Sequence, residues 1–261
     1  MKVKVSRILF VFFLAAFCTG TVFLARVSGA SREGLGCTAL EVTLADSLHF
    51  VSEEDVLNAI AASCGTLIGQ RADSVGLDGI ERLLEGHSAV RKCEAWICED
   101  GVLHIELWQR EPAARFLRTD GSGFYTDSEG YMFPLHPRYT APVPTVSGEI
   151  PVCEASDHRG EAGAAAEREW IGGVLEMLSF TASSPVWSGS LKSVTVEEGG
   201  NLTLTTSKGA ERVLFGRPEG YREKFSRLEK YYRQILPAAS QKGYTSVNVK
   251  YNNQIICRND T

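Results

Sequence analysis

The spacing of apolar residues predicts two helices early in the chain. The first helix is expected from about Ser52, which forms a capping pattern with Asp55. The second helix is expected to stop near Gly86. The apolar residues that form the two stripes are Val56, Leu57 and Ile60 in the first helix and Leu77, Ile80, Leu83 and Leu84 in the second.

Strands are predicted on both sides of these helices. A short apolar run at 40–44 precedes them, and two runs that alternate apolar with polar residues follow at 92–97 and 103–108. The turn at 99–101 joins the two alternating runs into a β-hairpin with one buried face. The order β-α-α-β-β predicts a sheet backed by two helices.

Short strands dominate the second half of the chain. A strand is predicted at 113–117, and turns rich in Asp and Gly follow at 120–123 and 127–130. A helix at 164–180 and a hairpin at 191–206 come next.

A long helix and a last strand complete the pattern. The helix is expected at 221–236, with Pro237 ending it, and its inward residues are Phe225, Leu228, Tyr232 and Ile235. The strand is expected at 245–257, where Val247, Val249 and Tyr251 share one face. The fold class is therefore α+β, with a second, mixed β domain that contains two helices.

The N-terminus has the pattern of a membrane anchor. Lys2, Lys4 and Arg7 precede an uncharged apolar run at 8–25, which as a helix is roughly 27 Å long, close to the thickness of a bilayer core. We expect a cytoplasmic tail at 1–7, a transmembrane helix at 8–25, a linker at 26–36 and the rest of the chain outside the membrane. A cleaved signal peptide, with a cut after Ala30, is the alternative.

Composition narrows the choice of function. The chain has a net charge of −5, and its Lys and Arg residues are not gathered into a basic block, so nucleic-acid binding is not expected. One of the seven cysteines, Cys18, lies in the apolar run. Cys93 and Cys98 are too far apart along a strand to bridge each other, whereas a bridge from Cys37 or Cys64 stays open.

Motifs for catalysis, metals or cofactors are not evident. The five histidines fall in unrelated elements without metal-ligand spacing, and the Gly-x-Ser-x-Gly and Ser-x-x-Lys motifs of serine enzymes are missing. Asp120, Asp127 and Glu129 fit turns better than a calcium loop. The sequence therefore predicts a protein that is not an enzyme, with no metal, no cofactor and no small-molecule substrate. Two placements stay open for the strand at 245–257: at a sheet edge, where its main-chain groups are available to a partner strand, or inside the sheet; Lys250 would blunt such an edge.

Four further segments are informative in their order and spacing: Arg-Glu-Pro-Ala-Ala-Arg-Phe at 110–116, Phe-Tyr-Thr-Asp at 124–127, Val-Pro-Thr-Val-Ser-Gly at 143–148 and Tyr-Asn-Asn-Gln-Ile-Ile-Cys at 251–257. Together they resemble the FtsQ (DivIB) family of cell-division proteins, and especially its Bacteroides-type members. The resemblance implies a polypeptide-transport-associated (POTRA) domain at 37–112 and an FtsQ-type β domain at 113–261. It also implies a single-pass inner-membrane protein whose bulk is periplasmic.

The resemblance further implies a scaffold role in septum formation. The POTRA domain would recruit other divisome proteins, and the β domain would hold FtsB- and FtsL-like partners by strand addition. The residues that the resemblance assigns to this contact are Tyr244, Ser246, Val247, Val249, Tyr251 and Asn253, with Arg222 and Arg233 as charge partners. Because main-chain bonds carry such a contact, a proline at 249 should do more than a side-chain change.

Two other functions remain as alternatives. One is a POTRA-type chaperone or accessory module of a secretion system in the cell envelope. The other is an envelope hydrolase, which requires acid and base residues gathered in a cleft.

Overall fold

The computed structural model describes residues 36–238 and 244–259, and the chain divides into two compact units between Gln109 and Arg110. The expected tail at 1–7, transmembrane helix at 8–25 and most of the linker at 26–36 lie outside the described residues. None of the described helices is both long and apolar enough to span a bilayer.

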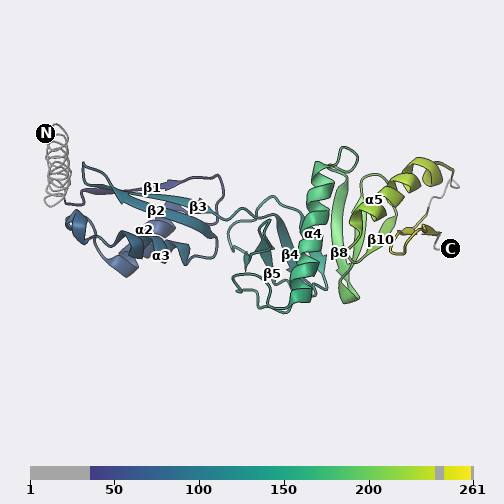
Figure 1. The fold of residues 1–261 in the computed structure, drawn as a ribbon, viewed down its shortest axis with the longest axis horizontal. Coiled ribbons are helices and arrows are strands. Elements are labelled where there is room, and N and C mark those ends of the chain that lie inside the picture. The colour runs from purple at the N-terminus through teal and green to yellow at the C-terminus, as the bar shows by residue number, and fades with distance from the viewer. Residues whose placement is uncertain (1–35, 239–243, 260–261) are drawn as a thin grey trace, which may run out of the picture. The chain divides into compact units, whose positions relative to one another are not determined.

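The first unit is a three-stranded sheet with two helices on one of its faces (Figure 1). The sheet order is β1-β3-β2, in which β1 runs parallel to β3 and β2 runs antiparallel to it. The element order is the predicted β-α-α-β-β. The elements are β1 (Ala39–Leu44), α2 (Glu53–Cys64), a 3₁₀ turn (Ala72–Ser74), α3 (Leu77–Glu85), β2 (Val90–Ile97) and β3 (Val102–Gln109).

Local sequence signals account for the helices of this unit. The Ser52 hydroxyl accepts a hydrogen bond from the Asp55 amide, and the Asp55 carboxylate accepts one from the Ser52 amide, so the predicted capping box is present. Val56 and Ile60 are buried against the sheet, but the prediction for Leu57 is wrong, because this side chain is 43% exposed. The stripe is therefore narrower than predicted.

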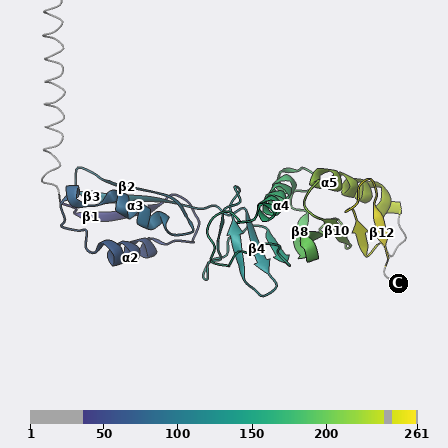
Figure 2. The same ribbon diagram turned by 60° about the horizontal axis from the view of Figure 1, so that its bottom comes forward.

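The second unit is a mixed nine-stranded sheet, with α4 (Ala165–Ser183) and α5 (Tyr221–Lys230) on one side of it (Figure 2). The sheet order is β12-β11-β10-β9-β8-β7-β4-β5-β6. The first six strands along the chain are β4 (Ala114–Arg118), β5 (Gly123–Thr126), β6 (Met132–Pro134), β7 (Thr145–Gly148), β8 (Leu191–Glu197) and β9 (Asn201–Thr206). The last three are β10 (Arg212–Gly216), β11 (Ser246–Asn248) and β12 (Ile256–Arg258).

The predicted helix at 221–236 is not one continuous α-helix. After α5 the backbone widens into a π-helical segment at Tyr231–Ile235 and then tightens into a 3₁₀ turn at Leu236–Ala238. The wider turn changes which side chain points inward. Tyr231 is completely buried, whereas Tyr232, predicted to point inward, is only partly buried.

The predicted strand at 245–257 is wrong, because this segment is a hairpin of two short strands, β11 and β12. The turn between them contains Asn252 and Asn253, and Asn253 adopts a left-handed φ of 60°. Asn tolerates this conformation better than other residues with a side chain, so the Asn pair favours a turn where alternation predicted a strand.

Candidate protein interface

The structure places β11 inside the sheet, not at its edge. β10 pairs with β11 on one side in parallel, and β12 pairs with it on the other side in antiparallel register. Ser246 and Val247 therefore lie on a strand that already has two neighbours. The proposed docking strand cannot be β11, and the terminal strand of the sheet is β12.

Three of the assigned residues hold the sheet together. Val247 and Val249 are fully buried in the core of the unit. The Val249 amide donates to the Leu214 carbonyl at 3.0 Å, and the Tyr244 ring packs on Tyr231 with centroids 6.2 Å apart. A proline at 249 would therefore remove a hydrogen bond within the sheet, so it tests folding and not docking.

Tyr251 and Asn253 lie in the exposed turn between β11 and β12. Tyr251 is 50% exposed, which is a large apolar surface for a ring at the tip of a hairpin. Both residues are exposed and belong to neither strand, so their assignment to a partner contact stays a prediction.

Cys257, at the centre of β12, carries the main-chain groups that can take another strand. Arg258 faces β11, because its carbonyl accepts a hydrogen bond from the Thr245 amide at 2.9 Å. Since main-chain groups alternate in direction along a strand, the N–H and C=O of Cys257 point away from β11. Among the described residues, no strand pairs with this outer side of β12.

Cys257 was not among the residues assigned from the sequence. The Asn pair before β12 was the signal that could have revealed it, because it marks a turn and therefore a separate last strand. The thiol itself is half-buried, and burial raises its pKa. The contribution of Cys257 to an interface is thus expected from its backbone.

Helix α5 supports β11 from the core side. The Arg227 guanidinium donates to the Val249 carbonyl at 2.9 Å, just beyond the end of β11. Phe225 is buried in an aromatic cluster, where its ring centroid lies 4.9 Å from that of Trp187 and 5.1 Å from that of Phe215. The position of the edge therefore depends on the packing of α5.

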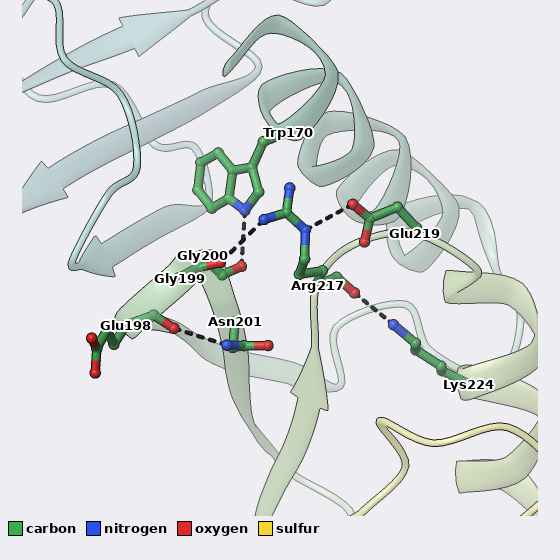
Figure 3. Close-up of polar contacts among 8 residues, drawn as sticks. All are labelled: Trp170, Glu198, Gly199, Gly200, Asn201, Arg217, Glu219 and Lys224. Atoms are coloured by element: carbon green, nitrogen blue, oxygen red, sulfur yellow. Dashed lines mark hydrogen bonds and ion pairs between the residues drawn. The ribbon is translucent and has the colours of Figure 1, made fainter. Parts of the chain in front are cut away.

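A polar network fixes the start of α5 relative to the rest of the sheet (Figure 3). The buried Lys224 ammonium donates to the Arg217 carbonyl at 2.6 Å, and desolvation lowers its pKa. The Arg217 guanidinium donates to the Gly199 carbonyl at 3.1 Å and pairs with Glu219 at 3.0 Å. These bonds join the β10–α5 connection to the turn between β8 and β9.

The same turn is tied to α4. The Trp170 indole N–H donates to the Gly200 carbonyl at 2.9 Å. Gly200 has a φ of 75°, and a Cβ there would lie 2.8 Å from Trp170 Nε1, so only glycine fits. Two helices and a hairpin turn thus form one rigid platform behind the terminal strands.

The two assigned arginines lie on α5 and its π-helical extension. The Arg222 guanidinium lies over the rings of Phe180 and Tyr221, 5.2 and 5.3 Å from their centroids. It borders an open groove of about 1010 Å³ along α4. Arg233 is exposed and pairs with Glu229 at 3.0 Å. Neither arginine belongs to the terminal hairpin.

The described residues contain no group of three or more His, Cys, Asp or Glu that could hold a metal ion. The six cysteines in the same part of the chain are free thiols. Cys93 is buried in the first unit, and burial raises the pKa of its thiol to about 12. The second unit therefore provides the outward main-chain groups of Cys257 in β12 for hydrogen bonding, and α4, α5 and the turn between β8 and β9 support this strand.

Comparison with known families finds a match for each of the two units. Residues 35–108 match a family described as POTRA-like domain, and residues 111–258 match one described as FtsQ/DivIB, C-terminal related. No curated protein matches the chain. Since the second match covers more than half of the sequence, the chain belongs to the FtsQ/DivIB family of cell-division proteins.

Proposed function

We propose that this protein is a scaffold of the divisome that is anchored in the inner membrane by one helix. It has no catalytic activity, its N-terminus is cytoplasmic and most of the chain is periplasmic. Its β domain binds FtsB- and FtsL-type proteins, and its POTRA domain recruits other division proteins. In this role it links early and late components of septum formation.

The observation that supports the β-domain contact is the outward main chain of Cys257 in β12. A partner strand that pairs here gains one N–H and one C=O hydrogen bond from this residue. The exposed turn at Tyr251 and Asn253 lies next to the same strand and supplies side-chain contact. Ser246, Val247 and Val249 act indirectly, because they hold β11 and through it β12.

The sharpest test replaces Cys257 with proline. Cys257→Pro removes the outward N–H and leaves the Ile256 and Arg258 groups that face β11. We expect the affinity for a purified complex of the FtsB- and FtsL-type proteins of the same organism to fall by about tenfold or more. Biolayer interferometry with the full-length protein measures this affinity.

Cys257→Ser is the matched control, because it changes the side chain and keeps the amide. It should bind the partner complex within about twofold of the unchanged protein. Thermal unfolding of both variants checks that the sheet is intact. Equal affinities for an intact proline variant and the serine variant would exclude strand addition at β12.

A further inference from the structure

The first unit exposes a sheet face that the proposed β12 contact does not use. The two helices of this unit cover one face of its sheet, and the opposite face carries the side chains that alternate with the buried core residues. We call this opposite face the outer sheet face. Its residues are Glu41 and Thr43 of β1, His104, Glu106 and Trp108 of β3, and Arg91, Lys92, Glu94 and Trp96 of β2.

Strand register brings aromatic rings together on the outer sheet face. Trp96 lies opposite His104, and the two rings stack with centroids 5.4 Å apart and planes 15° apart. The His104 imidazole nitrogen Nδ1 lies 3.3 Å from a carboxylate oxygen of Glu41. Trp96 is nevertheless 40% exposed, so an ordered indole face is presented to solvent.

Carboxylates surround these rings. Glu94 lies opposite Glu106, which in turn lies opposite Thr43. The basic residues of this face are Lys92 and Arg91, which oppose Trp108 together because β2 has a bulge between Val90 and Lys92. Lys92 pairs with Glu94 and lies 4.9 Å from the centroid of the Trp108 ring. With three glutamates, one lysine and one arginine, the outer sheet face has a small negative charge.

The whole unit is acidic. Residues 36–109 contain 13 Asp and Glu but only four Lys and Arg, a net charge of −9, whereas the chain as a whole has −5. Residues 110–261 contain 18 of each kind and are neutral. A negative domain attracts cationic partners and repels both a second copy of itself and anionic lipid.

We infer that the outer sheet face docks an arginine-rich segment of another protein. A guanidinium group can stack on the Trp96 indole and at the same time pair with Glu94 or Glu106. The flat, delocalised cation of Arg suits this arrangement better than the strongly hydrated ammonium of Lys. The inference rests on the proposed recruitment role of the POTRA domain and gives that role a surface and a partner chemistry.

Peptides can test this inference directly. The probes are labelled eight-residue peptides, the length of β2 and β3, in which Ala alternates with Arg, Lys or Glu. Fluorescence anisotropy measures their binding to the full-length protein in nanodiscs of zwitterionic lipid. We expect the Arg peptide to bind about fivefold more tightly than the Lys peptide and the Glu peptide not to bind.

Variants locate the binding. Trp96→Ala, and separately Glu94→Gln with Glu106→Gln, should each weaken Arg-peptide binding by about fivefold or more. Glu53→Gln with Glu54→Gln is the matched control: it removes the same charge from the exposed first turn of α2 and should leave binding within about twofold.

The outcomes separate this inference from the β12 proposal. Loss of Arg-peptide binding in the outer-face variants, with unchanged binding of the FtsB- and FtsL-type complex, supports it. Equal effects of the outer-face and α2 variants mean that only overall charge matters, and this overturns it. Absence of Arg-peptide binding to the unchanged protein also overturns it, whatever Cys257→Pro does at β12.

Discussion

The two units of this protein present surfaces of opposite character. The outer sheet face of the first unit offers rings and carboxylates on an acidic domain, whereas the β12 edge of the second unit offers the main chain of Cys257 on a neutral domain. A surface of the first kind selects a partner by its side chains. A surface of the second kind can pair with any segment that adopts an extended conformation. Substitutions that change a side chain and keep the backbone amide should therefore disable the first surface more easily than the second.

The two surfaces also differ in how they are supported. Trp96, His104 and Glu41 are positioned by register within a sheet of three strands. The β12 edge depends on a core that reaches across α4 and α5. Core substitutions far from β12 should thus weaken binding at this edge. Binding at the outer sheet face should change only with substitutions in the first unit.

The largest expected effect comes from the core of the second unit. Phe225→Ala removes a buried ring from contact with Trp187 and Phe215, and it should lower the free energy of unfolding of this unit by about 3–5 kcal/mol. Calorimetry of the full-length protein should show a lower unfolding temperature for the second unit alone. Arg-peptide binding to the first unit should not change.

Ile80→Ala provides the reciprocal experiment in the first unit. Ile80 is 1% exposed in α3, and its truncation should cost about 2–5 kcal/mol there while binding at β12 is kept. A single transition that moves with both variants would show that the units unfold together. The inference that the two surfaces are supported independently would then be incorrect.

The salt dependence of binding should distinguish the two surfaces, with a smaller effect than the core substitutions have. Raising ionic strength from about 0.1 M to about 1 M shortens the screening length from roughly 10 Å to 3 Å. Arg-peptide binding at the outer sheet face should weaken on the order of tenfold, while binding of the FtsB- and FtsL-type complex should change by about twofold or less. Titrations in both salts measure this, and an equal salt dependence of the two would contradict the assignment of a charged and an uncharged surface.

Much of the first unit could be predicted from sequence because its signals are local. The capping pair Ser52 and Asp55, the helical spacing of Ile80 and Leu84 and the alternation in the hairpin each depend on neighbouring residues. Leu57 was the exception, because its exposure depends on how far the sheet reaches under α2. A helical wheel does not contain that information.

The candidate site was harder to predict because it depends on pairing between distant strands. Val247, Val249 and Tyr251 do alternate with polar residues. This alternation, however, continues past the end of β11 into the turn that Asn253 makes possible. The parallel pairing of β11 with β10 fixed which strand became the edge, and no local pattern encodes this pairing. The assignment therefore fell on β11, which has a neighbour on each side, and not on the terminal strand β12.

The smallest expected effect concerns the tyrosine pair of the π-helical segment behind the edge. The hydroxyl of Tyr231 is buried without a hydrogen-bond partner in the described part of the chain, whereas that of Tyr232 lies 2.9 Å from Thr206 Oγ1. Tyr231→Phe should therefore be neutral or stabilising by up to about 1 kcal/mol at pH 7, and Tyr232→Phe should cost about 1 kcal/mol. Urea unfolding of the two variants measures the difference.

The loss of stability at alkaline pH is a second test of Tyr231, and its direction follows from the pKa of this residue. Burial raises the pKa of Tyr231 above its usual value of 10.0, so the unfolded chain loses this proton first as the pH rises. The unfolded state then binds fewer protons than the folded state, and stability falls above pH 10. Tyr231→Phe should reduce this fall without changing partner affinity at neutral pH. A fall as steep as in the unchanged protein would assign the alkaline sensitivity to other groups whose pKa burial raises, such as Tyr232 and the Cys257 thiol.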